Sequence, residues 1–195
     1  MFRIALTGGI ASGKSTALAL LAERGIPCFC ADEAVAELYA PYGKAWRKLR
    51  AAFPALVSER GVCREKLWAV LLRNPSVLGR LEKLVHPLLK KEMQAFTRRH
   101  EGAPILCFDI PLLFETRMEK RFDAIILLST PPHIRRSRAA MPPAQYGFLL
   151  GRQNSFFKNK CALEKTGVPA LILKNGGKLE NLQRQLDGFL ASLSP

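Results

Sequence analysis

Hydrophobic residues in the first part of this chain gather in short runs separated by an amphipathic segment. The runs at residues 2–6 and 26–29 are typical of buried strands. Between them, residues 14–24 carry apolar side chains at helical spacing, and Gly25 ends the pattern. A strand, a glycine-rich turn, a helix and a second strand form a βαβ unit, which implies a parallel sheet. The start of the chain therefore predicts an α/β fold.

The pattern changes between residues 33 and 102, where helical spacing replaces the strand-like runs. Five segments are amphipathic and are predicted as helices: residues 33–38, 44–53, 64–72, 76–85 and 87–100. Pro87 suits the first turn of the last of these helices, so a turn is expected at His86. We interpret residues 33–102 as a helical insertion into a core made of residues 1–32 and 103–195.

Strand-like runs return after the insertion, at residues 105–109, 124–128 and 170–173. Between the last two, residues 135–160 are polar and basic and contain two adjacent prolines, which favours a mobile segment. Residues 178–193 carry leucines on one face and predict a closing helix. The chain is thus expected to form one parallel sheet flanked by helices.

The turn after the first strand carries the sequence GGIASGKST, which satisfies the pattern G-x-x-x-x-G-K-[ST]. Glycines let the backbone fold closely round a phosphate, so that successive N–H groups converge on its oxygens. The helix that follows adds its dipole, Lys14 is expected to reach the β- and γ-phosphates, and Ser15 to ligate Mg²⁺. The alternative is a glycine turn that only links strand to helix. We predict a three-layer α/β/α fold of the P-loop NTPase type. Its P-loop is expected to bind ATP or GTP and is made by Gly8, Gly9, Ile10, Ala11, Ser12, Gly13, Lys14, Ser15 and Thr16.

Two aspartates follow predicted strands, whose carboxyl ends face the ligand in a sheet of this kind. Asp32 comes after the second run and could accept a proton from an attacking hydroxyl, or could cap the next helix. Asp109 closes the run at residues 105–108 and could hold Mg²⁺ through water, or could cap a turn before Pro111. The residues alone leave both pairs of alternatives open.

Composition narrows the partners. The 195 residues include 30 Lys and Arg against 16 Asp and Glu, a formal net charge of +14, which implies a polyanionic partner, either nucleic acid or a small phosphorylated substrate. No apolar run reaches the ~18–20 residues that cross a bilayer, and the first strand-like run begins at once, so we expect no membrane partner and a cytoplasmic location. The five cysteines lack paired metal-ligand spacing and are expected to be reduced.

Several of these residues occur together in one known family. The chain carries the P-loop, Asp32, the sequence LVHP at residues 84–87, PLLFE at 111–115, Gln153, and Asn175-x-Gly177, in this order. Together they resemble the dephospho-coenzyme A kinases, over almost the whole chain. The P-loop is shared by many families, whereas PLLFE joined to the preceding Asp and to the His-Pro pair is far more selective.

The resemblance implies MgATP-dependent phosphorylation of the ribose 3′-hydroxyl of dephospho-coenzyme A, with a basic lid at about residues 136–162. It implies that Asp32 is the base and that Lys14 and Arg138 act on the transferred phosphate. It places Arg136, Asn175 and Gly177 at ATP. The residues it implies at the acceptor are Asp32, His86, Leu112, Leu113, Phe114 and Glu115. For His86, a local hydrogen bond that fixes the turn before Pro87 is the alternative.

The chain departs from the family pattern at three points. Cys30 stands where an acid is usual, and Lys174 replaces an aspartate. The lid is shorter than in the family, so Arg138 aligns with the lid arginine of the family only when residues are counted back from the end of the lid. Two other functions stay open: a P-loop kinase for a nucleoside or nucleotide, and a basic nucleic-acid-binding ATPase. Because no recognisable nucleic-acid module is present, we expect no nucleic-acid partner, and a monomer or small homo-oligomer.

Overall fold

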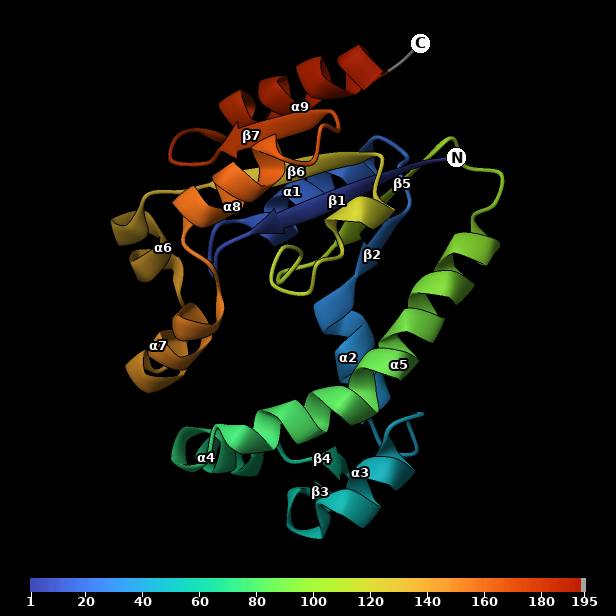
Figure 1. Ribbon diagram of the computed structural model, residues 1–195, viewed down its shortest axis with the longest axis vertical. Coiled ribbons are helices and arrows are strands. Elements are labelled where there is room, and N and C mark those ends of the chain that lie inside the picture. Colours follow the sequence, from blue (N-terminus) through green and yellow to red (C-terminus); the bar gives the residue numbers. More distant parts are fainter. Residues whose placement is uncertain (194–195) are drawn as a thin grey trace. The chain divides into compact units, whose positions relative to one another are not determined.

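The computed structural model describes residues 1–193, which divide into two compact units (Figure 1). The first unit is made of Met1–Phe29 together with the chain from His100 onward, and the second is Cys30–Arg99. The helical insertion predicted at residues 33–102 covers most of the second unit. Its role in binding an acceptor stays a prediction.

The first unit is built round a five-stranded sheet with strand order β2-β5-β1-β6-β7. Strand β1 pairs in parallel with β5 and with β6, and β6 pairs in parallel with β7. The prediction of a parallel sheet is confirmed. The strands are β1 (Phe2–Gly8), β2 (Cys28–Cys30), β5 (Ile105–Asp109), β6 (Ala124–Ser129) and β7 (Ala170–Lys174).

Helices flank this sheet and complete the expected α/β fold. Helices α1 and α9 share one buried cluster with the strands, and α8 packs against β6. Cys107 on β5 belongs to this cluster, and its neighbour Phe108 points to the opposite face of the strand. There the ring of Phe108 lies 5.6 Å from the ring of Phe122. The helices of the first unit are α1 (Lys14–Glu23), η2 (Glu119–Arg121), α6 (Pro132–Arg138), α7 (Pro143–Arg152), α8 (Phe156–Glu164) and α9 (Leu179–Leu193).

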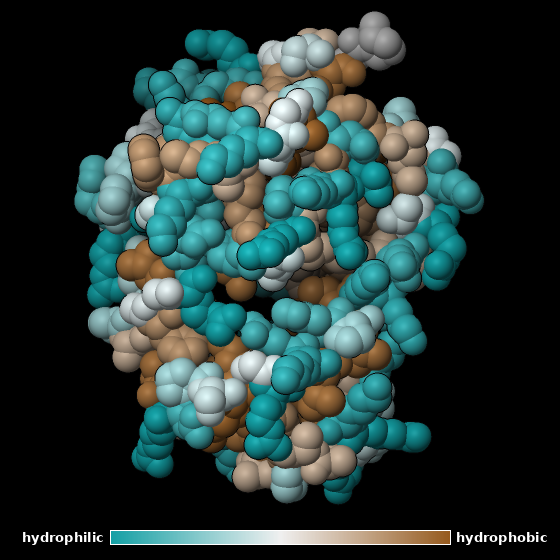
Figure 2. Space-filling view, viewed as in Figure 1, coloured by the Kyte–Doolittle hydropathy of each residue, from teal (hydrophilic) through white to brown (hydrophobic). Residues whose placement is uncertain are grey.

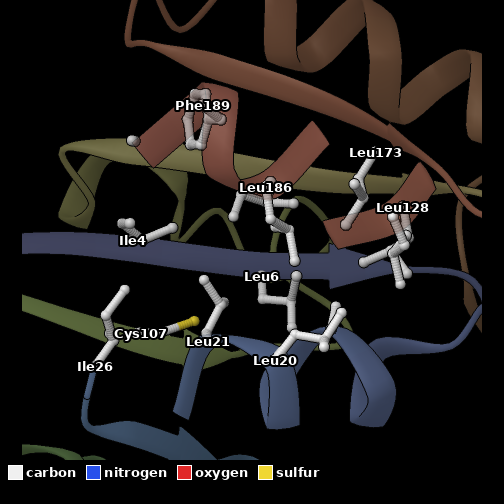
Figure 3. Packing of buried hydrophobic residues seen from close by; sticks show 14 residues of the cluster. Ile4, Leu6, Leu20, Leu21, Ile26, Cys107, Leu128, Leu173, Leu186 and Phe189 are labelled. Carbon is white, nitrogen blue, oxygen red and sulfur yellow. The ribbon is translucent and has the colours of Figure 1, made fainter. Parts of the chain in front are cut away.

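The main core lies between the sheet and helices α1 and α9. Ile4 and Leu6 point to the same face of β1 because side chains alternate along a strand. Figure 3 shows Leu6 between Leu20 of α1 and Leu186 of α9, with Ile4 closer to the start of β1. This packing fixes where β1 ends and α1 begins, and therefore holds the glycine-rich turn between them.

Helix α9 offers a matched test of this core. Leu186 is fully buried, whereas Leu179 at the start of the same helix is 49% exposed. Leu186→Ala is expected to lower the free energy of unfolding by about 2–5 kcal/mol, because it removes buried methyl groups and leaves a cavity. Leu179→Ala is expected to change it by less than about 0.5 kcal/mol. Urea unfolding measures both, and equal midpoints would show that α9 is not part of the core.

The second unit is mostly helical and also contains a short hairpin that the sequence pattern did not indicate. The indole Nε1 of Trp46 donates a hydrogen bond of 2.9 Å to the carbonyl of Ser58, which ties α3 to this hairpin. The elements are α2 (Ala31–Tyr39), α3 (Trp46–Ala52), η1 (Pro54–Leu56), β3 (Val57–Ser58), β4 (Gly61–Val62), α4 (Arg64–Arg73) and α5 (Ser76–Arg99).

Helix α5 corrects the prediction of two helices with a turn at His86. It runs unbroken from Ser76 to Arg99 with Pro87 inside it. Proline removes one N–H from the helix ladder and favours a bend, and Figure 1 shows α5 changing direction along its length. The buried side chains of Leu81, Val85 and Phe96 lie on both sides of the proline, and their packing outweighs its effect.

The basic segment at residues 135–160 is also more regular than predicted. It folds as part of α6, as α7 and as part of α8. Pro142 is the N-cap of α7 and Pro143 its first residue, a position where the missing N–H costs nothing because it would have no partner in the helix. The two prolines therefore start a helix instead of interrupting one.

The cysteines agree with the prediction of reduced thiols, since all five are free in the structure. A hydrogen bond to Cys28 and complete burial raise the pKa of the Cys107 thiol well above its usual range, so this thiol stays neutral. Among residues 1–193 no helix is both long and apolar enough to span a membrane. Figure 2 shows hydrophilic residues over much of the face in view, with hydrophobic residues scattered between them.

Candidate active site

The glycine-rich turn joins β1 to α1 in the way that the sequence predicted. Strand β1 ends at Gly8 and α1 begins at Lys14. Gly13 has a φ of 93°, and a Cβ there would overlap the side-chain amide of Asn175, so only glycine fits. Ala11 has a φ of 55°. Left-handed residues in such a turn aim successive N–H groups into one concavity, which binds anions.

Lys14 places a cation at this turn. Its Nζ donates a hydrogen bond of 3.3 Å to the carbonyl of Gly8, so the ammonium group folds back over the loop. Ser15 and Thr16 are exposed on the first turn of α1. Main-chain amides, a helix N-terminus and an ammonium group thus come together, and this combination suits a polyphosphate.

Asp109 lies on the strand next to the turn. It ends β5 in register with Leu6 of β1, two residues before Gly8, and it is 3% exposed. In the described part of the chain no group of three or more His, Cys, Asp and Glu side chains could hold a metal ion. The hydroxyl of Ser15 and the carboxylate of Asp109 are oxygen donors of the kind that suit Mg²⁺, which usually completes its coordination with water and substrate phosphates.

Asn175 connects the end of β7 to the turn. Its side-chain Nδ2 donates a hydrogen bond of 2.8 Å to the carbonyl of Ser12, and its main-chain N–H donates one of 2.9 Å to the carbonyl of Ser129. The hydroxyl of Thr130 donates to the same Ser12 carbonyl at 2.8 Å. Asn175 is only 9% exposed. It therefore braces the P-loop from inside the first unit.

A cavity of about 560 Å³ opens beside Asn175, within the size range of small-molecule sites. Gly176 and Gly177 contribute backbone without side chains, which leaves room for a flat ligand. The cavity is lined by Ser129, Pro131, Lys174, Gly176, Gly177, Asn181, Arg184 and Gln185. It lies next to Asn175 and Gly177, where the resemblance places ATP.

Helix α6 brings arginines to the P-loop, and the roles of Arg136 and Arg138 at ATP stay predictions. Arg138 Nη1 donates a hydrogen bond of 3.3 Å to the carbonyl of Asn175. Arg136 stacks over the ring of Tyr146 at 5.0 Å, toward α7. Arg135, which the sequence reasoning missed, lies directly against the loop, since a Cβ on Gly9 would overlap its guanidinium group. The three-residue spacing of Arg135 and Arg138 on one helix face was the available signal.

The stretch PLLFE follows β5. Leu113 is fully buried and Phe114 is 8% exposed, whereas Leu112 and Glu115 are half-buried. Glu115 Oε1 accepts a hydrogen bond of 2.6 Å from the main-chain N–H of Asn154. Leu112 and Glu115 thus offer more surface to a ligand than the other two do. Contact of these four residues with an acceptor stays a prediction.

The two remaining predicted residues belong to the second unit. Asp32 is exposed in the first turn of α2, and the N-cap of that helix is Cys30, so Asp32 is not the N-cap. His86 is exposed within α5 and not in a turn. The catalytic role of Asp32 and the acceptor role of His86 stay predictions.

A second residue whose contact the sequence did not reveal is Gln153, which follows α7. Its side-chain Oε1 accepts a hydrogen bond of 2.7 Å from the main-chain N–H of Ile10 in the P-loop. The two residues are 143 positions apart, so no local pattern could predict the bond. Gln153 entered the sequence analysis only as part of the family resemblance.

Comparisons with known proteins show the family of the chain. A sequence model of the dephospho-CoA kinase family matches residues 2–142. The dephospho-CoA kinase of Brucella melitensis is 36% identical over 197 residues, covering 100% of this chain and 96% of the relative.

Solved structures agree on the fold. A crystal structure from Thermus thermophilus is 29% identical and superposes with a TM-score of 0.80, covering 100% of this chain and 98% of that chain. A dephospho-CoA kinase structure from Campylobacter jejuni, 19% identical, shares the fold with a TM-score of 0.68 and covers 98% of this chain and 96% of that chain. Because the family model matches residues 2–142 and the Brucella melitensis relative is 36% identical over the whole chain, the chain belongs to the dephospho-CoA kinase family.

Proposed function

We propose that this chain transfers the γ-phosphoryl group of ATP to the ribose 3′-hydroxyl of dephospho-coenzyme A, which gives coenzyme A and ADP. The observation that carries the proposal is the P-loop of a chain that aligns over its whole length with a dephospho-CoA kinase. In the reaction a bond forms between the ribose oxygen and the γ-phosphorus while the bond to the β,γ-bridging oxygen breaks, and the hydroxyl proton must go to a base.

The nucleotide would bind to the first unit. Main-chain amides of the P-loop and the ammonium group of Lys14 would hold the β- and γ-phosphates. The cavity beside Gly176 and Gly177 would take the adenine, since it lies at the end of β7 next to Asn175, which bonds the P-loop. Arg138, bonded to the carbonyl of Asn175, and Arg136 would contribute positive charge from the lid.

Magnesium would be held at Ser15 and Asp109, which are oxygen donors on α1 and β5. When bound, Mg²⁺ would neutralise charge on the phosphates. Ser15 is an exposed residue of the first turn of α1, and its hydroxyl would reach an ion near the loop. The carboxylate of Asp109 is buried, and so it would act through water, as the sequence analysis expected.

The acceptor would be held in part by the second unit. Asp32 is an exposed carboxylate in the first turn of α2 and would accept the hydroxyl proton. His86 on the exposed side of α5 and the half-buried Leu112 and Glu115 of the first unit are further candidates for acceptor contacts. Because this chemistry uses the ATP pool of the cell, we propose that the protein acts in the cytoplasm.

A coupled assay of ADP release tests the choice of acceptor. Dephospho-coenzyme A is expected to give a kcat/KM higher than that of adenosine or AMP by on the order of 10²-fold, because those acceptors lack most of the groups that a specific pocket recognises. A reaction without acceptor measures the background hydrolysis of ATP. Equal rates with all three acceptors would instead support a kinase of broad nucleoside specificity.

The same assay separates the proposal from a nucleic-acid-dependent ATPase. If the protein were such an ATPase, its net charge of +14 would serve to bind RNA or DNA. Added polynucleotide would then stimulate ADP release in a strongly salt-dependent way. We expect no stimulation, because the positive charge is accounted for by two polyanionic small substrates. Stimulation by polynucleotide in the absence of dephospho-coenzyme A would favour the ATPase.

A further inference from the structure

Gln153 and Asn154, which lie between lid helices α7 and α8, make hydrogen bonds to two different segments of the first unit. Gln153 follows α7 with extended backbone, φ −91° and ψ 139°. Its side-chain oxygen accepts from the N–H of Ile10 at 2.7 Å, while the N–H of Asn154 donates to Glu115 at 2.6 Å. One short joint thus contacts both the P-loop and the end of the PLLFE stretch.

The Ile10 bond reaches the P-loop inside a turn. Gly9 lies before Ile10, and Ala11 after it has a positive φ of 55°. Within the loop, the N–H of Ser12 bonds the carbonyl of Gly9 at 3.1 Å. Ile10 therefore lies within this turn, and its own N–H donates to a partner from outside the loop, Gln153.

The Asn154 bond anchors the joint. Its acceptor is a carboxylate, and hydrogen bonds to charged acceptors are stronger than those between neutral groups. Gln153, Asn154 and Glu115 are all half-buried, which weakens competition from water. On the other side Ser155 caps α8, its side chain accepting from the N–H of Lys158 at 3.3 Å. The joint is thus held on both sides of Gln153.

We propose that Gln153 is a positioning residue: by accepting from the Ile10 N–H it fixes the backbone conformation of the P-loop that phosphoryl transfer requires, and it couples the lid to the P-loop. The inference rests on the proposed function. Without Gln153, other loop amides and Lys14 still bind the nucleotide, but the backbone of the P-loop at Ile10 loses the contact that holds it. The chemical step should therefore suffer more than ATP binding does.

Two substitutions separate this role from simple packing. Gln153→Leu keeps the size of the side chain and removes the acceptor; kcat is expected to fall about tenfold, the upper range for one hydrogen bond, with the KM for ATP within about twofold of wild type. Gln153→Glu keeps an acceptor oxygen at the same reach; it should recover most of kcat but raise the KM for ATP, because a carboxylate then lies near the triphosphate.

Gln145→Leu is the matched control, because Gln145 is another half-buried glutamine of the lid, on α7. It is expected to keep the kcat of wild type. If Gln153→Leu fails to fold, Gln153→Asn, whose oxygen is one methylene short of the Ile10 amide, takes its place with the same expected loss. A kcat for the Gln153 variant equal to that of Gln145→Leu would overturn the proposal.

Amide hydrogen exchange of the free protein provides a readout that needs no acceptor. By NMR the Ile10 amide should be protected in wild type and in Gln153→Glu, and should exchange about tenfold faster in Gln153→Leu. Unchanged exchange would show that Gln153 does not hold this amide. Failure of the wild type to phosphorylate dephospho-coenzyme A would contradict the proposed function, while the exchange experiment would still decide whether the bond exists.

Discussion

Asp32→Asn is expected to lower kcat by on the order of 10²–10⁴, the contribution typical of a positioned general base, while the Kd for ATP stays near that of wild type. The substitution keeps the shape of the side chain but removes its ability to take the proton of the acceptor hydroxyl. In the proposed site the phosphates of ATP would be bound by the P-loop, residues 8–16, which the change does not touch. Steady-state kinetics with dephospho-coenzyme A and calorimetric titration with ATP measure the two quantities.

Glu33→Gln is the matched control for this prediction. Glu33 and Asp32 are both exposed acids in the first turn of α2, so each interacts favourably with the helix dipole to a similar extent. Both variants should lose the same small amount of thermal stability, and only Asp32→Asn should lose turnover. If the two variants have the same kcat, Asp32 is not the base.

Lys14→Ala is expected to lower kcat/KM for ATP by on the order of 10²–10³. The substitution removes the cation that would stabilise the negative charge developing on the transferred phosphate. The loop itself should survive, since the bonds from Asn175 and Thr130 to the carbonyl of Ser12 do not involve the lysine. Kinetics at saturating dephospho-coenzyme A, with circular dichroism as a check of folding, provide the measurement.

Lys120→Ala serves as the control for the loss of one positive charge. Lys120 is exposed on η2, and the P-loop contacts described above do not include it. Its kcat/KM should equal that of wild type within about twofold, as expected for an exposed charge away from the site. A Lys14→Ala enzyme that matches the Lys120→Ala enzyme would remove Lys14 from the mechanism.

The parts of this molecule that the sequence predicts well are those with local causes. The turn from Gly8 to Lys14 follows from glycine spacing, because left-handed backbone at Gly13 requires a residue without a side chain. The strands at residues 105–109 and 124–128 follow from continuous apolar runs, since parallel strands are buried on both faces. Asp109 could be placed at the end of its strand because the apolar run stops there.

The features that the sequence did not predict depend on contacts between distant segments. Pro87 indicated a turn, but packing along α5 keeps the helix continuous. Pro142 and Pro143 indicated an interruption, but they form the start of α7. The contact of Arg135 with Gly9 and the bond of Gln153 to Ile10 join residues more than a hundred positions apart, and no periodicity can report them.

The identity of the phosphorylated product tests the central claim most directly. Wild-type protein is incubated with MgATP and dephospho-coenzyme A, and the product is analysed by ³¹P NMR and mass spectrometry. The account predicts one new phosphomonoester on the ribose 3′-oxygen, formed in equal amount to ADP. ADP accompanied only by inorganic phosphate, or a phosphate at another position of the acceptor, would contradict it.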